Sequence, residues 1–169
     1  MKDENTNYVS YLIDLAASGR QRAMIELAAI NLKNVFTVSY RLLANYDSAK
    51  KVTKKTFHYA WEQIKKFDGK VSFPGWVKSI SIQFSIKELS SRSPEPNPSI
   101  KAATSLNPAE NLEQLIMSLP ITDRIIFVLH DLEGFSYREI NAYIGNMLPD
   151  EIKTKLLAAR NYLMDKLGL

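Results

Sequence analysis

The chain has 169 residues, of which 46% are apolar and 24% charged, enough for one compact domain or two small helical ones and too few for a large multidomain enzyme. It contains no cysteine, which excludes disulfides, iron–sulfur clusters and thiolate zinc sites and fits a reducing compartment. Lys and Arg outnumber Asp and Glu by 22 to 18, so a nucleic-acid partner is permitted but not required.

The ends and the apolar runs give no sign of export or of a membrane span. The polar N-terminus lacks the apolar core of a signal peptide. The densest apolar run, 125–129, is far shorter than the roughly 20 residues that cross a bilayer. We therefore expect a cytoplasmic protein that makes no membrane contact.

Apolar residues recur at helical spacing along the first half of the chain. This spacing predicts four helices: one ending near Gly19, one over 23–43, a lysine-rich one over 48–67, and one from Trp76 to about Leu89. Residues 91–107 follow, with Pro94, Pro96 and Pro98 in close succession. Each proline removes an amide donor and favours extended geometry in the residue before it, so we predict a linker here.

The second half predicts four further helices, starting near Pro108, Thr122, Ser136 and Pro149. A short helix from Ser136, a connection containing Gly145 and a longer helix from Pro149 to Leu167 form a helix-turn-helix candidate. We therefore predict an all-α fold of two small helical domains, 1–90 and 108–169, joined by a Pro/Ser-rich linker at 91–107.

The residues offer little for catalysis or for a metal. His58 and His130 fall in different predicted domains, and neither has the spacing of a metal site. The six glycines are scattered, so no phosphate-binding loop is present. Asp131 and Glu133 are close in sequence, but a position next to a helix end favours solvation over a paired-carboxylate site. We predict no catalytic residue, no metal and no cofactor.

Lysines concentrate in the helix predicted over 48–67 and just beyond it. Residues 47–106 carry 11 basic against 5 acidic side chains. The lysines concerned are Lys50, Lys51, Lys54, Lys55, Lys65, Lys66 and Lys70. Because these charges repel one another, we expect an acidic partner, either a phosphate backbone or an acidic protein surface. The aromatic residues among them suit either base stacking or the core: Tyr59, Trp61, Phe67, Phe73 and Trp76.

Both halves resemble the extracytoplasmic-function (ECF) sigma factors, the small two-domain relatives of the bacterial housekeeping sigma subunit. The first half resembles their region 2 in 12–19, Arg41-Leu42-Leu43, Thr56-Phe57, Ala60-Trp61, Phe67, Phe73, Trp76 and Ile80. The second half resembles their region 4 in Leu119-Pro120, Arg124, Phe127, Leu129, 132–140 and Ile144-Gly145. The predicted linker falls between the two, as it does in that family.

The resemblance implies a protein without enzymatic activity that binds core RNA polymerase through the β′ coiled coil and the β flap. It implies that region 2 reads the minus-ten promoter element and that region 4 binds the minus-35 element. The implied polymerase contacts are Lys50, Lys51, Lys54, Lys55, Phe57 and Trp61. The implied minus-ten contacts are Lys65, Phe67, Lys70, Phe73, Trp76 and Lys78. The implied helix-turn-helix contacts are Tyr137, Lys153, Thr154, Lys155 and Arg160.

Among the departures from the family pattern, two change the chemistry of a whole segment. The family carries an acidic Asp-Ala-Glu-Asp stretch against the β′ coiled coil, where this chain has Ser48-Ala49-Lys50-Lys51, so charge is reversed at a contact site. Leu157-Ala158-Ala159 replaces a more basic stretch in region 4.

Two hypotheses follow. The first is a divergent sigma factor whose promoter choice is weakened or delegated to a separate DNA-targeting partner. The alternative is a sigma-like protein that no longer binds polymerase and uses its lysine helix on an acidic protein or nucleic acid. An anti-sigma factor is a further candidate partner.

Overall fold

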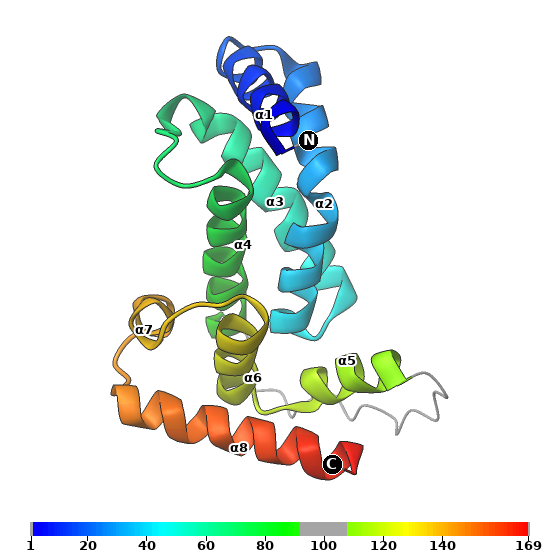
Figure 1. Cartoon of the computed structure of the whole chain (residues 1–169), viewed down its shortest axis with the longest axis vertical. Helices are drawn as coiled ribbons and strands as arrows, with labels where there is room; N and C mark the ends of the chain where they lie inside the picture. The colour runs from blue at the N-terminus through cyan, green and yellow to red at the C-terminus, as the bar shows by residue number, and fades with distance from the viewer. Residues whose placement is uncertain (1, 92–107, 169) are drawn as a thin grey trace.

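A computed structural model describes residues 2–91 and 108–168, with side chains for 7–91 and 111–168. These residues form helices and loops and contain no strand, which confirms the predicted all-α class (Figure 1). The first half holds α1 (Lys2–Ala17), α2 (Gln21–Leu43), α3 (Tyr46–Gln63), the 3-10 turn η1 (Ile64–Lys66) and α4 (Phe73–Ser90). The second half holds α5 (Pro108–Ser118), α6 (Ile121–Phe127), the π-helical turn η2 (Val128–Leu132), α7 (Tyr137–Ile144) and α8 (Pro149–Leu167).

Helices α1 to α4 form a bundle around α2, which contacts each of the other three. Its apolar stripe buries Leu27 and Val35 against Ala60 of α3 and Val77 of α4. An N-cap fixes the start of α3, because the Asn45 side chain accepts a hydrogen bond from the amide of Ser48. The bundle thereby presents the outer side of α3, which carries the lysines, to solvent.

The start of α4 corrects one prediction. We expected this helix to begin at Trp76, whereas it begins at Phe73. Ser72 is the N-cap and accepts a hydrogen bond from the Gly75 amide at 3.3 Å. Pro74 then lies within the first helical turn, where its missing amide has no helical partner to lose. Pro74 therefore belongs to the start of α4, whereas we expected it in the loop before the helix.

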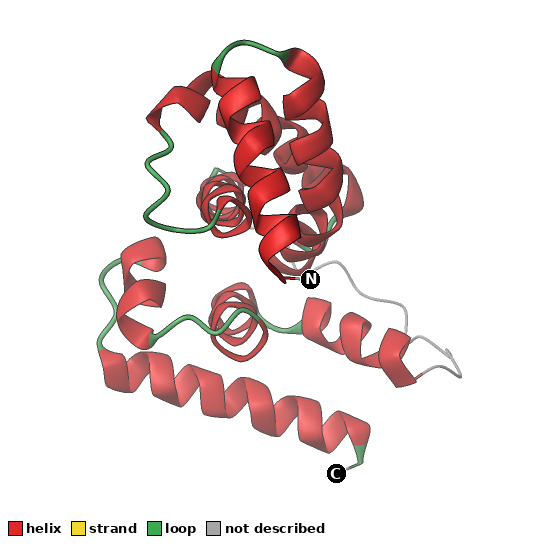
Figure 2. Ribbon diagram, turned by 45° about the horizontal axis from the view of Figure 1, so that its top comes forward, coloured by secondary structure: helices red, strands yellow, loops and turns green. Residues whose placement is uncertain are grey.

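Helices α5 to α8 form the lower part of the molecule, with α8 running along its base (Figure 2). Buried apolar residues of α6, η2, α7 and α8 pack together here: Ile126, Leu129, Ile140, Ile152 and Leu156. Helix α7 begins with a capping box, in which Ser136 and Glu139 each bond the other's backbone amide. The short helix and the long helix of the predicted helix-turn-helix are thus both present.

The two halves share one apolar cluster. Val38 and Leu42 of α2 and Ile82 of α4 belong to the same buried cluster as Ile116 and Ile126 of the second half. Contacts run from α2 to α5 and α6, and from α4 to α7. Most of the predicted linker, 92–107, lies outside the described residues, and the domain boundaries at 90 and 108 stay predictions.

Within the described segments, we find no helix with the length and apolarity that a bilayer crossing requires.

Candidate protein and nucleic-acid interfaces

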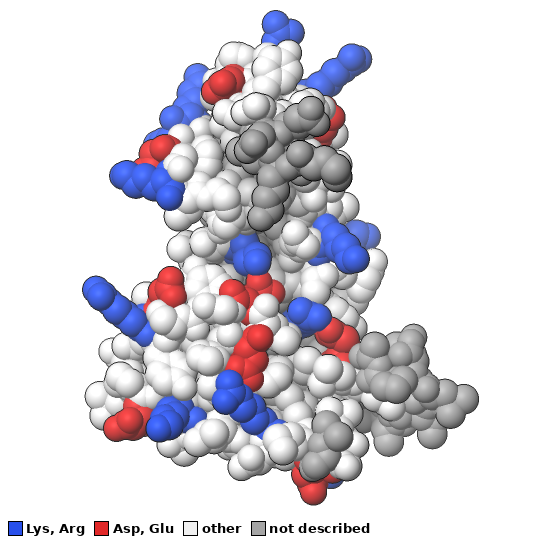
Figure 3. All heavy atoms as spheres, viewed as in Figure 1, with Lys and Arg blue, Asp and Glu red and all other residues white. Residues whose placement is uncertain are grey.

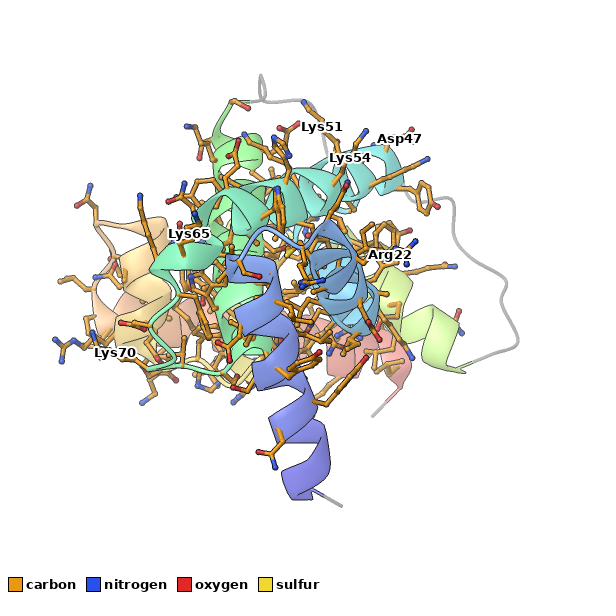
Figure 4. The ribbon with its side chains drawn as sticks, turned by 90° about the horizontal axis from the view of Figure 1, so that it is seen from above. Arg22, Asp47, Lys51, Lys54, Lys65 and Lys70 are labelled. Carbon is orange, nitrogen blue, oxygen red and sulfur yellow. The ribbon has the colours of Figure 1, made fainter. Side chains whose placement is uncertain are left out.

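The four clustered lysines of α3 are all exposed, and Figure 4 shows Lys51 and Lys54 extending from the same side of the helix. The Lys51 ammonium lies 3.6 Å from a carboxylate oxygen of Glu88 on α4. The Lys55 ammonium lies 4.6 Å from the centre of the Phe84 ring, within range of a cation–π interaction. Among the described residues, Lys50 and Lys54 have no ion pair. This surface therefore carries positive charge that its own acids neutralise only in part.

The aromatic residues predicted beside these lysines have a different place. Phe57 and Trp61 are half-buried and pack against the bundle core. These two rings pack on the inner side of α3, while its lysines are exposed to solvent. A direct contact between these rings and a partner stays a prediction.

The loop after η1 carries the residues predicted for the minus-ten element. Phe67 packs on Phe73 and Trp76, with ring centres 5.7 and 5.1 Å apart. Phe73 is only 2% exposed, so it anchors the loop in the core instead of offering a face to a base. Lys65 and Lys70 are exposed.

A hollow of about 360 Å³ lies between this loop and α1. Ile13, Phe67, Gly69, Val71 and Pro74 are among its lining residues. Within the loop, the Asp68 carboxylate lies 2.8 Å from the Lys70 ammonium and accepts a hydrogen bond from the Lys70 amide. Those two bonds lower the pKa of Asp68. The hollow is apolar and adjoins exposed cations, which suits an unpaired base beside a phosphate.

Lys78, predicted to contact the minus-ten element, faces the second half of the molecule. Its ammonium lies 2.6 Å from Glu133, whose side chain is 11% exposed. In this arrangement Lys78 bridges α4 and the segment after η2. A promoter contact would require this ion pair to open.

Two of the basic side chains predicted to bind DNA through the helix-turn-helix are bound by acids of the same chain. Lys155 donates to Asp123 at 3.1 Å, while Lys153 and Thr154 are exposed. The Arg160 guanidinium binds both carboxylate oxygens of Asp131, at 2.8 and 2.6 Å.

That bidentate bond lowers the pKa of Asp131 and raises the pKa of Arg160. His130 adds a hydrogen bond to the same carboxylate, and its ring packs on Tyr137 with centres 5.1 Å apart. Asp131 thus joins Arg160 of α8 to His130 of η2, and the His130 ring contacts Tyr137 at the start of α7.

The exposed side of α8 mixes apolar and polar side chains. Leu157 is 46% and Met164 50% exposed, and Lys153, Thr154 and Asn161 of the same helix are exposed as well. Base edges in the major groove are read mainly by Arg, Lys, Asn and Gln. The exposed apolar residues therefore limit the part of α8 that can read bases directly.

Three charged side chains bind the halves together in a way that the sequence did not predict. Arg124 of α6 is 2% exposed and donates to the backbone oxygens of Leu42, Met117 and Leu119. Arg41 of α2 forms an ion pair with Glu113 of α5, with its Nε donating to both carboxylate oxygens at 3.1 and 3.0 Å.

The Glu113 hydrogen bond raises the pKa of Arg41. Arg124 directly precedes the apolar run 125–129, which is the one local sign that its charge is buried.

No arrangement suited to catalysis emerges from the described residues. Asp131 and Glu133 bind different cations, so they do not form a carboxylate pair. His58 is exposed and lies 3.4 Å from Glu62. No group of three or more His, Asp or Glu side chains in the described segments is placed to hold a metal ion.

Comparison with known proteins shows what the chain is similar to. Residues 109–145 match the family "Sigma-70, region 4". The chain is 28% identical over 171 residues to the ECF RNA polymerase sigma factor SigE of Mycolicibacterium smegmatis, an alignment that covers 90% of this chain and 65% of that protein. It is 22% identical to the ECF RNA polymerase sigma factor SigW of Bacillus subtilis, over 88% of this chain and 91% of that one. The chain thus spans less than two thirds of the length of the mycobacterial relative.

Two solved structures share the fold. One is CnrH in complex with the cytosolic domain of CnrY, with a TM-score of 0.60, 22% identity and coverage of 95% of this chain and 97% of that one. The other is the sigma factor RpoE in complex with the anti-sigma factor NepR from Bartonella quintana, with a TM-score of 0.57, 18% identity and coverage of 83% and 94%.

Fold and sequence therefore define a helical protein in which residues 109–145 match sigma-70 region 4. The relatives that the chain matches over most of its length are ECF sigma factors, and these distant matches support the resemblance seen in the sequence.

Proposed function

We propose that the protein is an RNA polymerase sigma factor of the ECF type, which binds core RNA polymerase and promoter DNA and has no enzymatic activity of its own. The observation that carries this proposal is the match along most of the chain to two proteins named as ECF RNA polymerase sigma factors. The sigma-factor interpretation is thereby favoured over a sigma-like protein that no longer binds polymerase. The cytoplasm is the compartment in which this activity would operate.

The geometry suggests how promoter opening would use the first half. An unpaired base would enter the hollow beside Phe67 and Val71, while Lys65 and Lys70 would meet the neighbouring phosphates. Phe73 and Trp76 would hold Phe67 in position from behind. Lys78 would join this surface once it leaves Glu133.

Promoter choice through the second half is expected to be weak. Lys153 and Thr154 are exposed and would meet the duplex, whereas Lys155 and Arg160 are bound to acids of the same chain. Leu157 and Met164 add exposed apolar side chains to α8. We therefore propose that a separate DNA-targeting protein contributes to promoter choice.

An anti-sigma factor is a further proposed partner. A structural neighbour, RpoE, is seen in complex with the anti-sigma factor NepR. The exposed apolar and cationic surfaces of this chain would offer such a partner its contacts.

The test mixes the purified protein with core RNA polymerase of its own organism on promoter DNA and challenges the complex with heparin. We expect co-migration with core polymerase and a complex that survives the heparin challenge. Absence of co-migration at every salt concentration would contradict the proposal.

A further inference from the structure

The outer surface of α3 and α4 forms a small cationic groove. Its volume is about 170 Å³, and it is lined by Lys51, Val52, Lys55, Phe84, Lys87, Glu88 and Ser91. We call this the lysine groove. Lys50 and Lys54, each one residue before a groove lysine on α3, are exposed as well, and Figure 4 shows Lys54 beside Lys51.

The charge of this surface is not balanced by the described part of the chain. Lys50 and Lys54, and likewise Lys51 and Lys55, stand four residues apart on α3, a spacing at which like charges repel and destabilise a helix. Glu88 is the acid that approaches them, and the Lys51 side chain beside it is still 71% exposed. A bound anionic partner would relieve this repulsion.

The floor of the groove favours a protein over a single-stranded nucleic acid. The Phe84 ring has the Lys55 ammonium on one side and the edge of Tyr59 packed against it, with ring centres 5.5 Å apart and an interplanar angle of 80°. The ring is therefore not open for stacking by a base, which is the main sequence-independent contact of unpaired nucleic acid. Glu88 on the rim would also repel a phosphate.

A protein segment that combines apolar and acidic side chains fits these features better. One aliphatic side chain could rest on the apolar floor formed by Val52 and Phe84. Carboxylates on either side of it would then pair with the lysines of the rim, while Glu88 would tolerate a neutral or basic neighbour. An acidic amphipathic protein segment has this composition.

We propose that the lysine groove docks an acidic segment of core RNA polymerase. This inference rests on the proposed function, and it specifies a partner surface of opposite sign to the one that the family's acidic stretch would need. The lysines supply steering and specificity, and the apolar floor supplies a desolvated contact.

The experiment measures binding of the protein to core RNA polymerase of its own organism, without DNA. We expect Lys51→Glu/Lys55→Glu, at two residues that line the groove, to weaken binding at least about tenfold, because it places carboxylates against carboxylates. Lys51→Gln/Lys55→Gln is expected to bind with an affinity between those of the wild type and the glutamate variant. Wild-type binding should weaken from roughly 50 to 300 mM salt more steeply than that of the glutamate variant.

The matched control is Lys33→Glu/Lys166→Glu, which makes the same change in net charge at exposed residues of α2 and α8. We expect it to bind as the wild type does. A photo-cross-linking residue at Ser91 should attach to a segment of polymerase rich in Asp and Glu. Circular dichroism checks that every variant is folded.

The outcomes separate the two proposals. If the wild type binds polymerase and the glutamate variant binds equally well, or if Ser91 cross-links to a basic segment, the lysine groove proposal is overturned and the sigma-factor proposal stands. If the wild type does not bind polymerase, both fall.

Discussion

Arg124 joins the two halves through hydrogen bonds to main-chain oxygens at the ends of two helices. Its guanidinium donates at 3.1 Å to Leu42 near the end of α2, and at 2.8 and 3.2 Å to Met117 and Leu119 at the end of α5. The last carbonyls of a helix lack helical partners and carry partial negative charge, so a cation suits them. A planar guanidinium reaches several such oxygens at once, which an ammonium cannot do as well.

We therefore expect Arg124→Met to lower the free energy of unfolding by about 3 kcal/mol, because it leaves buried carbonyls without donors. Urea unfolding followed by circular dichroism measures this. Arg138→Met, at an exposed site, is the control and should change stability by less than about 0.5 kcal/mol. Equal losses in the two variants would show that Arg124 does not have this role.

Asp131 makes stability depend on pH on the acid side. The Arg160 hydrogen bonds lower its pKa, so the carboxylate stabilises the fold above the unfolded-state pKa of about 3.9 and loses that effect as pH falls through the lower folded-state pKa. Arg160 is 42% exposed, which reduces the expected contribution to about 1 kcal/mol.

Asp131→Asn should therefore destabilise the protein at neutral pH, and the difference from wild type should shrink below about pH 4. Thermal unfolding between neutral and acid pH measures the difference. A difference that stays constant down to pH 3 or so would contradict a role for the charge.

At the level of single elements, α7 depends on its capping box. Ser136 accepts from the Glu139 amide at 3.3 Å, and Glu139 accepts from the Ser136 amide at 2.8 Å. The hydrogen bonds from Ser136 also lower the pKa of Glu139. Because α7 has only 8 residues, little else within the helix can compensate for a lost cap.

Ser136→Ala is expected to cost about 1 kcal/mol of stability, measured by thermal unfolding. The control is Ser90→Ala, since Ser90 is exposed at the end of α4 and bonds only back to the Ile86 carbonyl. We expect the control to lie close to wild type. Equal melting temperatures for the two variants would show that the capping box does not limit the stability of the protein.

The sequence predicted helices well because their starts are encoded locally. Ser136 with Glu139 and Pro149 with Glu151 mark helix starts within four residues of chain, and the structure has helices at both places. Pro74 misled the prediction for α4, because a proline at the first turn and a proline that interrupts a helix look alike without the Ser72 hydrogen bond.

For the candidate sites too, local features could be predicted from the sequence and long-range contacts could not. That the α3 lysines are exposed followed from helical spacing. The ion pairs of Lys78 with Glu133 and of Arg160 with Asp131 could not be predicted from helical spacing. Their partners are 55 and 29 residues apart and meet only through packing of helices. Local patterns cannot supply such pairs.

At the level of the whole molecule, polar and apolar contacts act together where the halves meet. The shared cluster around Leu42, Ile82 and Ile126 supplies a dry core, and Figure 3 shows cationic and anionic side chains alternating at the waist of the molecule. A hollow of about 590 Å³ adjoins this contact, between Gln83 of α4 and Tyr143 of α7. Domains of one chain can move apart at interfaces that are partly polar. The charged pairs at this contact are therefore expected to influence whether the two halves stay together.

The Lys78–Glu133 pair tests this balance directly. Lys78→Glu would place two carboxylates at a site where Glu133 is 11% exposed, and the repulsion should separate the halves. We expect a larger radius of gyration by small-angle X-ray scattering and earlier unfolding, with the swap Lys78→Glu/Glu133→Lys restoring both through a coupling energy of about 1–2 kcal/mol. Lys54→Glu, the same change of charge at an exposed site on α3, should leave the radius unchanged. If the swap fails to recover compactness, the apolar cluster alone decides how the halves meet and the ion pair is incidental.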